Sequence, residues 1–519
     1  FWNTVRVSLL YAVLAVGAQL LLGLCIALLL QRRHWLNDLM GVLLILPLMV
    51  APAIAALMWK LMTNPNFGVL SYLLTVLGWP DFTWAASPHS ALFTVLLVDT
   101  WVYTPFITLL LLAGLRALPR QPFEAAELDG VPASFVFFRI TLPMLTPYML
   151  TAALFRMLDA IQQFDIIYSM TQGGPGDTLT VFQVQAYLEA FSFSNIGRSA
   201  ALVMILWAIT CAPARAARLE TWADDANTHK VDAMPTMPTW IANTLRALAL
   251  AAVGLFFLFP ILWVLLMSFM TQADILRSPP SPLFSPTLDN YRALISGQLS
   301  SGVGSMSADY LKNLFNSFFL SSAAVLVSLL LGVPAAYAFA RFKFRLGEDM
   351  AFTLLSFRFA PPILVLLPLQ LYFQEVGLYD TYVGLIWVYQ LITLPLILWI
   401  VRGYFEDINP DIEHAYRLDG HGWLATFWKI AIPLARPGIA AAGLLAFIFA
   451  WNNFVFALIL GSSEVQPVTV GALAFITASG IQYGVIAAAL VLSVVPTLAL
   501  ALYAQRYLVE GLSMGAVKG

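Results

Sequence analysis

Residues 124–147 read EAAELDGVPASFVFFRITLPMLTP, and residues 414–437 repeat the pattern as HAYRLDGHGWLATFWKIAIPLARP. In each stretch the glycine of a Leu-Asp-Gly triplet lies thirteen residues before a proline, and a second proline follows four residues later. A further match supports the first, because Gly23 precedes Arg32 by nine residues just as Gly332 precedes Arg341. Agreement at so many fixed spacings indicates that the chain is an internal repeat of two related halves.

The composition is typical of a membrane protein. Of the 519 residues, 60% are hydrophobic and 10% are charged, whereas soluble domains are about 45–50% apolar and about 25% charged. The formal net charge of −2 argues against a nucleic-acid partner. Cys25 and Cys211 lie in apolar runs without metal-ligand spacing, so we expect inert thiols. The chain starts at Phe1 without a signal-peptide pattern, and we expect the natural N-terminus, with one more span, to be missing.

Long apolar runs predict an all-α, polytopic membrane protein. A helix needs about 20 apolar residues to cross the hydrocarbon core. On that rule the sequence predicts eleven spans, at 7–30, 40–62, 91–115, 146–167, 195–212, 247–270, 316–340, 350–373, 383–401, 433–459 and 484–505.

The distribution of Lys and Arg predicts the orientation. Loops 63–90, 374–382 and 460–483 contain neither residue, whereas the loops holding the repeated stretches contain Arg116, Arg120 and Arg139 in the first half and Arg402, Arg417, Lys429 and Arg436 in the second. The repeated stretches are therefore predicted to be cytoplasmic, as is the C-terminus. Because both copies lie on one side, the two repeats are parallel.

A polar stretch at 213–245 is predicted to be a cytoplasmic linker. It divides a first domain at 1–212, with five spans, from a second at 246–519, with six. A natural fusion, an engineered joint and a concatenation of two subunits remain open.

Each repeated stretch has the features of a short helix held beneath the membrane. Glu124 to Leu128 favours a helix and puts acid in its first turn. Gly130 and Gly420 permit the positive φ that ends a helix sharply. The following prolines, Pro143 and Pro433, open the next span. An ordinary interfacial helix is the alternative, and the duplication weakens it.

The pattern of EAA, three residues to Gly, then I-x-LP resembles the cytoplasmic signature loop of binding-protein-dependent ABC importer permeases. More narrowly, it is similar to the permease subunits of carbohydrate importers of the maltose, trehalose, polyol and glycerol-phosphate type. The resemblance covers nearly the whole chain and is supported by NPNFG (64–68), DTWVYTPF (99–106), TQGGPG (171–176) and FAWNNF (449–454). Relative to that family, the first half lacks its first transmembrane helix.

The resemblance implies that two loops dock on ATPase subunits. We call residues 124–132 the first loop and residues 414–422 the second loop. The implied contacts are Glu124, Ala125, Ala126, Asp129 and Gly130 in the first loop, and Glu413, His414, Ala415, Asp419 and Gly420 in the second. Because His414 replaces the signature Glu, the second loop is not expected to make the same salt bridge.

The chain has no readable catalytic motif. None of its six lysines lies in a Gly-rich G-K-[ST] loop, and its five histidines show no metal spacing. We therefore expect a permease that is not an enzyme and holds no cofactor. The resemblance implies that two copies of an ABC ATPase bind ATP and Mg, that an extracytoplasmic binding protein delivers a sugar or polyol, and that the chain lies in a bacterial inner membrane.

Ionisable residues within spans are expensive and suggest a functional site. Arg156, Asp159 and Gln163 share one helical face at i, i+3 and i+7. Either Arg156 and Asp159 neutralise each other, or the face lines a cavity. The resemblance implies substrate contacts from Asp99, Val102, Tyr103, Arg156, Asp159 and Gln163 in the first half and from Trp451, Asn452 and Asn453 in the second. Arg156 would suit an anionic phosphate or sulfonate.

Two other classes of protein remain as alternatives. A secondary transporter also has repeated halves, but it would need a coupling-ion site rather than two docking loops. A channel or membrane scaffold would not concentrate its solute.

Overall fold

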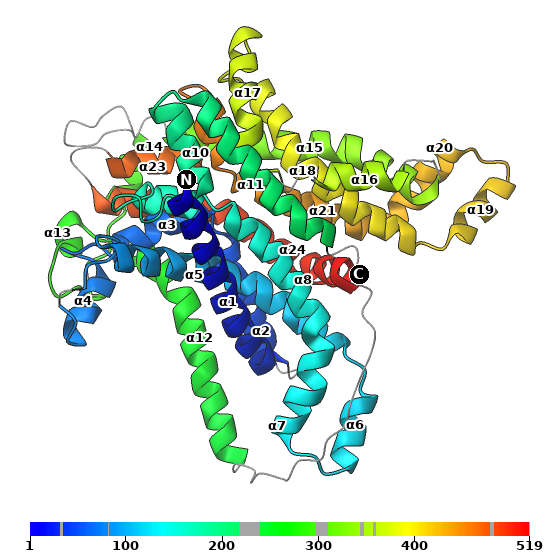
Figure 1. Ribbon diagram of the computed structural model, residues 1–519, viewed down its shortest axis with the longest axis horizontal. Helices are drawn as coiled ribbons and strands as arrows, with labels where there is room; N and C mark the ends of the chain where they lie inside the picture. The colour runs from blue at the N-terminus through cyan, green and yellow to red at the C-terminus, as the bar shows by residue number, and fades with distance from the viewer. Residues whose placement is uncertain are drawn as a thin grey trace.

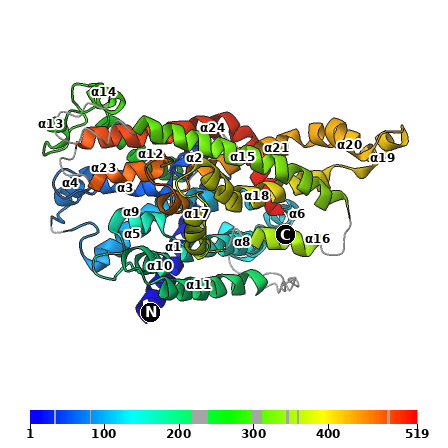
Figure 2. The ribbon, with the colours of Figure 1, turned by 90° about the horizontal axis from the view of Figure 1, so that it is seen from above.

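The computed structural model describes residues 1–31, 35–80, 82–216, 239–296, 310–342, 347–356, 360–477 and 482–517. Within these ranges every regular element is a helix (Figures 1 and 2). The all-α fold predicted from the apolar runs is therefore confirmed.

The first half runs from α1 to α11. Its elements are α1 (Trp2–Leu30), α2 (Trp35–Met49), α3 (Pro52–Met62), α4 (Val69–Val76), α5 (Pro88–Ala117), α6 (Gln121–Leu128), α7 (Ala133–Phe135), a π-helical turn (Val136–Thr141), α8 (Leu142–Ile161), α9 (Asp165–Thr171), α10 (Phe182–Tyr187), a second π-helical turn (Leu188–Ser192) and α11 (Ile196–Ala216).

The second half runs from α12 to α24. Its elements are α12 (Thr239–Met267), α13 (Gln272–Ile275), α14 (Asp289–Ser296), α15 (Tyr310–Arg341), α16 (Gly347–Ser356), α17 (Pro362–Glu375), α18 (Tyr382–Asp407), α19 (Pro410–Leu418), α20 (Trp423–Thr426), a π-helical turn (Phe427–Ala431), α21 (Ile432–Trp451), α22 (Val455–Leu460), α23 (Val468–Thr477) and α24 (Tyr483–Val517).

In the described residues, eight helices are long and apolar enough to span a bilayer, and a bent pair within α2 and α3 makes a ninth. The pair bends by 95°, because Pro52 forces Ala51 out of the helical region. The predicted span 195–212 matches the shorter apolar helix Ile196–Thr210. The predicted span 350–373 includes residues 357–359, outside the described residues. The exact number of eleven spans stays a prediction.

The linker predicted at 213–245 is only partly described. Helix α11 extends into it as far as Ala216, and α12 already begins at Thr239. Residues 217–238 lie outside the described residues. The domain boundaries therefore stay a prediction.

The repeat seen in the sequence is also a repeat in space. Helix α1 packs on α5 as α15 packs on α18, with a glycine at the crossing in each half. A Cβ on Gly23 would lie 2.8 Å from Ile107 Cγ2, and one on Gly332 would lie 3.0 Å from Ile397 Cγ2. Only glycine allows helices to approach so closely, so the match between Gly23 and Gly332 reflects packing.

A glycine–tyrosine contact recurs with its two residues exchanged. In the first half Gly114 of α5 lies against the ring of Tyr148 on α8, where an added Cβ would be 2.6 Å from Cγ. In the second half Gly438 of α21 lies against the ring of Tyr404 on α18. The tyrosine ring fits only where the facing residue is glycine. The glycine is on α5 and the tyrosine on α8 in the first half, whereas in the second half the tyrosine is on α18 and the glycine on α21.

The prolines that follow each loop shape the backbone before α8 and α21. Pro143 and Pro433 have no N–H, and their rings would clash with the carbonyl four residues earlier. The chain relaxes into a π-helical turn in both halves, with the N–H of Leu142 donating to Phe137 O and that of Ile432 to Phe427 O. The two loops therefore join their spans through the same geometry.

Candidate functional site

The first and second loops stand away from the bundle at the ends of α6 and α19 (Figure 1). Both helices end at the predicted glycine, with φ of +65° at Gly130 and +90° at Gly420. The N–H of Gly130 donates to Glu127 O at 3.1 Å, and that of Gly420 donates to Arg417 O at 3.0 Å. The short helix and sharp turn that the sequence predicts are therefore present in both loops.

The tips of the two loops expose the same leucine. Leu128 is 90% exposed and Leu418 is 88% exposed. Of the predicted first-loop contacts, Glu124, Ala125 and Asp129 are also exposed, whereas Ala126 is buried. The sequence analysis missed both leucines as contacts, although each opens its Leu-Asp-Gly triplet.

The second loop differs in its internal anchoring. Glu413 is 1% exposed, and its carboxylate accepts hydrogen bonds from Arg341 Nε at 2.9 Å and from the Tyr337 hydroxyl at 2.7 Å. This carboxylate fastens α19 to α15, so direct contact between Glu413 and an ATPase is not expected. His414 is exposed, as are Ala415, Asp419 and Gly420. Docking by these four residues stays a prediction.

A buried charged cluster joins three helices of the first half. Arg156 Nη2 on α8 lies 2.5 Å from Asp99 Oδ2 on α5, and both side chains are fully buried. Gln19 of α1 bridges them, donating to Asp99 Oδ2 at 2.8 Å and accepting from Arg156 Nε at 2.8 Å. The Arg156 guanidinium also lies 4.0 Å from the centre of the Tyr103 ring. The pair is hydrogen-bonded and stacked, whereas Arg156 Nη1 and Asp99 Oδ1 are buried with no hydrogen-bond partner among the described residues.

The arrangement differs from the sequence-based expectation in its partners. Asp159 is exposed, and the ion pair of Arg156 is with Asp99, so the alternative in which Arg156 and Asp159 neutralise each other is not the arrangement found. Helix α8 ends at Ile161. The helical register therefore does not extend to Gln163, which lies beyond the helix end. Val102 is buried in the apolar core.

The second half has a neutral cluster at the place corresponding to Gln19 and Tyr103. Ser328 of α15 donates to Gln390 Oε1 and contacts Thr393 Oγ1 at 2.6 Å, both on α18. These residues hold α15 and α18 together without charge. Gln19 was not predicted as a site residue, because a single glutamine in an apolar run is not part of any recognisable motif. Alignment of the two repeats could have identified it, because Gln19 precedes Gly23 by four residues just as Ser328 precedes Gly332.

Both halves break a helix at the same point. Helix α8 stops at Ile161 and α9 starts at Asp165, while α21 stops at Trp451 and α22 starts at Val455. The backbone is alike at the two breaks, with φ −128° and ψ −51° at Phe164 and φ −116° and ψ −49° at Phe454. The breaks face each other, because the rings of Phe164 and Phe454 stack with their centroids 6.3 Å apart.

Side-chain amides at the two breaks have buried atoms without partners. These are Gln163 Nε2, Asn452 Oδ1 and Asn453 Oδ1, and the described residues supply no hydrogen bond to any of them. A buried polar atom left unpaired costs free energy, so such atoms mark where a polar guest or water completes the bonding. Trp451 does not share this property: it is buried, and its Nε1 donates to Ser493 O at 3.1 Å.

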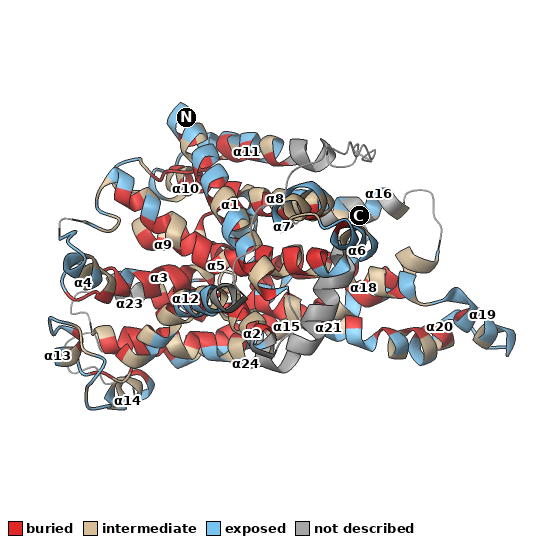
Figure 3. Cartoon of the chain, turned by 90° about the horizontal axis from the view of Figure 1, so that it is seen from below, coloured by how far each residue is buried: buried red, intermediate tan, exposed pale blue. Residues whose placement is uncertain are grey.

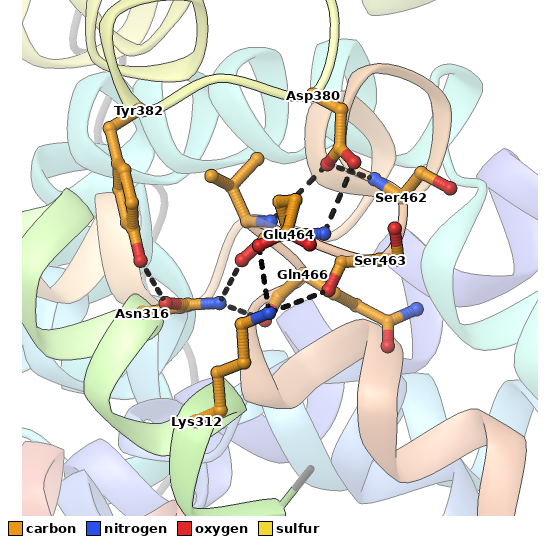
Figure 4. Close-up of polar contacts among 9 residues, drawn as sticks. Lys312, Asn316, Asp380, Tyr382, Ser462, Ser463, Glu464 and Gln466 are labelled. Atoms are coloured by element: carbon orange, nitrogen blue, oxygen red, sulfur yellow. Dashed lines mark hydrogen bonds and ion pairs between the residues drawn. The ribbon is translucent and has the colours of Figure 1, made fainter.

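At the other end of the bundle, the carboxylate of Asp380 holds the turn between α22 and α23 (Figure 4). Asp380 Oδ1 accepts from the N–H of Ser462 at 2.7 Å and of Val465 at 3.2 Å, and Oδ2 accepts from the N–H of Glu464 at 3.1 Å. The turn is therefore fixed through its backbone, which leaves the side chains of Ser462 and Glu464 exposed.

Helix α15 holds the same turn from a second side (Figure 4). Asn316 Nδ2 donates to Glu464 O and Gln466 O, each at 3.1 Å, and its Oδ1 accepts from the Tyr382 hydroxyl at 2.6 Å. Lys312 Nζ lies 3.0 Å from Glu464 Oε2 in an exposed pair. The result is a rigid polar surface at the end opposite the two loops.

Two parallel repeats, paired helix breaks in the middle of the bundle and two similar exposed loops at one end fit a membrane permease. The sequence profile described as "Binding-protein-dependent transport system inner membrane component" matches residues 19–219 and again residues 328–513. The chain therefore belongs to this family of ABC transporter permeases, and it holds two permease units. The resemblance stated from the sequence is confirmed.

Known relatives agree with this assignment. The Trehalose/maltose transport system permease protein MalF of Thermococcus litoralis is 38% identical over 38% of this chain and 65% of that protein. The Sulfoquinovosyl glycerol transport system permease protein SmoG of Agrobacterium fabrum is 33% identical over 40% of this chain and 68% of that protein. The Trehalose transport system permease protein SugB of Mycobacterium tuberculosis is 33% identical over 50% of this chain and 93% of that protein. The match to MalF thus spans just under two thirds of that relative.

Proposed function

We propose that this chain is the permease of an ATP-driven importer for a sugar or sugar derivative. Separate ABC ATPase subunits, two per chain, bind ATP and Mg and dock on the first and second loops. No cofactor binds to the chain itself. The observation that carries the proposal is the pair of leucines, Leu128 and Leu418, displayed in the same way on two matching loops. An apolar side chain so exposed at a rigid tip indicates a surface that a partner covers.

The solute path in this proposal runs between the two helix breaks. Gln163, Asn452 and Asn453 offer unpaired amide atoms there, and the stacked rings of Phe164 and Phe454 offer apolar faces. Amides and aromatic faces together suit the hydroxyls and C–H faces of a sugar. Broken helices at the interface of repeats are a recurring form of transporter site.

The charge balance favours a neutral solute. Arg156 is buried and its charge is already balanced by Asp99, so an anion bound at the guanidinium would place two negative groups against one buried cation. The relatives' names include trehalose and maltose, which are neutral, and sulfoquinovosyl glycerol, which carries a sulfonate. Binding of a neutral disaccharide in preference to its sulfonated analogue follows from the proposal.

The remaining parts of the proposal concern the two sides of the membrane. The two loops and the C-terminus face the cytoplasm, as the Lys and Arg bias predicts. An extracytoplasmic binding protein delivers solute at the opposite end, where the turn at 461–466 is held rigid. ATP binding draws the two loops together, and the spans that follow them pass the movement to the helix breaks as a rigid-body switch. Domains 1–212 and 246–519 each form one permease unit, joined by the linker 213–245.

The docking claim is tested by co-purification of the cognate ATPase with leucine variants. Leu128→Asp and Leu418→Asp should each lower the amount of bound ATPase, because a carboxylate would be buried in an apolar contact. Leu283→Asp is the matched control, since Leu283 is 84% exposed and lies between α13 and α14 at the opposite end. Unchanged ATPase recovery with both loop variants would refute the docking role and reopen the secondary-transporter alternative.

A further inference from the structure

One connection exists in the first half without a counterpart in the second. Residues 63–87 join α3 to α5, whereas residues 376–381 suffice to join α17 to α18. The longer connection contains α4, which lies at the end of the bundle opposite α19 (Figure 2). The second half lacks this segment. A conformational switch that both halves share therefore does not account for its presence in the first half.

The segment around α4 is apolar and exposed. No Asp, Glu, Lys or Arg occurs between Leu61 and Pro80. On and just after α4, Leu77 is 73% exposed and Trp79 is 66% exposed, and the side chains of Leu73 and Val76 are exposed as well. Figure 3 shows this end of the chain as exposed, outside the buried core of the bundle. An exposed apolar surface of this kind is unfavourable in water and indicates that lipid or a partner covers it.

Two of the three side-chain hydroxyls of α4, those of Ser71 and Thr75, are hydrogen-bonded within the segment. Ser71 Oγ donates to Thr63 O at 3.1 Å, and Thr75 Oγ1 donates to Ser71 O at 3.1 Å. At the C-terminal end, Gly78 has φ of +91°, and the N–H of Trp79 donates to Leu74 O at 2.9 Å. This cap pairs carbonyl groups that a helix otherwise leaves to solvent. Internal pairing of this kind is what a water-poor surrounding requires.

Aromatic rings connect the segment to a membrane span. The ring of Phe82 lies 5.0 Å from that of Trp84 and 6.1 Å from that of Phe93, centroid to centroid. Phe93 belongs to the spanning helix α5 and is half-exposed. Trp and other aromatic side chains gather where the bilayer meets water. Phe82 and Trp84 therefore place the chain that follows α4 against an exposed aromatic residue of a spanning helix.

We propose that residues 69–80 lie in the boundary between headgroups and acyl chains of the outer leaflet, with Leu73, Val76, Leu77 and Trp79 inserted into lipid. The occupant of this face is lipid, not a soluble protein, because a soluble partner's site would be expected to have a polar rim. Residues 61–80 contain no Asp, Glu, Lys or Arg, and the first charged residue after Lys60 is Asp81. The proposal rests on membership in an inner-membrane family and on this geometry. It does not depend on the identity of the solute or on ATPase docking.

Spin-label accessibility tests the proposal in the full chain, reconstituted in phosphatidylethanolamine–phosphatidylglycerol vesicles. In a Cys25→Ser, Cys211→Ser background, Leu77→Cys and Ser462→Cys are labelled separately. Ser462 is the control because it is exposed on a polar turn. We expect the Leu77→Cys label to collide readily with oxygen, which partitions into lipid, and several-fold less with a water-soluble nickel chelate than the Ser462→Cys label does.

Three results would overturn the proposal. A Leu77→Cys label that collides with the nickel chelate as often as the Ser462→Cys label does would show that the face is in water. A label shielded from both reagents would show that protein covers it. Lower nickel collision only after the cognate binding protein is added would assign the face to that protein, and lipid would again be excluded.

Discussion

Replacing Asp99 in the buried Asp99–Arg156 pair should lower the free energy of unfolding by an amount that can be estimated from the structure. In Asp99→Ala, the Arg156 guanidinium loses its carboxylate 2.5 Å away but remains fully buried. Gln19 then supplies its only described hydrogen bond, through Oε1. Removing one partner of a buried pair costs about 3–5 kcal/mol because it leaves an uncompensated charge. The folded-to-unfolded ratio should therefore fall by roughly two to three and a half orders of magnitude.

Equilibrium unfolding of the purified chain in mixed micelles, with Asp159→Ala as control, measures this loss. Asp159 lies on α8, the helix of Arg156, but is exposed. Its replacement should therefore change the free energy of unfolding by no more than about 0.5 kcal/mol. The double variant Asp99→Ala, Arg156→Leu removes both charges and should recover most of the lost stability. Independent, additive losses in the double-mutant cycle would refute the inference that the two residues act as one buried unit.

Three further predictions follow from other contacts. Glu413→Ala should destabilise the fold by about 3–5 kcal/mol by freeing the buried Arg341, whereas Glu124→Ala should weaken ATPase binding in a pull-down without altering thermal stability. Gly438→Tyr should fail to pack against Tyr404, and Tyr404→Gly in addition should restore a monodisperse elution profile, because the double variant copies the first half. Asn453→Ala should reduce sugar-stimulated ATPase activity at least about tenfold, because the bound sugar loses a buried hydrogen bond. The melting temperature should not change. An equal loss of ATPase activity without sugar would indicate that Asn453 has a structural role instead.

The parts of the fold that could be predicted are those with a periodic or repeated signal. Long apolar runs located the spans, and the two Leu-Asp-Gly triplets located the loops, because span length and turn geometry are local properties of the chain. The bend at Pro52 was missed because the apolar run continues through it. Hydropathy does not distinguish a straight span from one that turns by 95°.

The candidate site was predicted less well, since its partners come from distant parts of the chain. Asp99 and Arg156 were both selected as ionisable residues in spans, but the pairing between them depends on how α5 packs on α8. Periodicity instead favoured Asp159, and the helix end at Ile161 removed Gln163 from that face. The role of Glu413 was likewise decided by Arg341 and Tyr337, which lie on α15 rather than near it in sequence.

The central claim is that this chain moves a sugar against its gradient at the expense of ATP hydrolysed by a docked partner. Its most direct test uses proteoliposomes containing the chain and its ATPase, with ATP trapped inside and the binding protein with labelled trehalose outside. Internal trehalose should rise above the external concentration. This accumulation should require ATP, should be insensitive to ionophores and should be lost in the Leu128→Asp, Leu418→Asp double variant. Uptake that only equilibrates, or that proceeds without ATP and collapses with an ionophore, would contradict it.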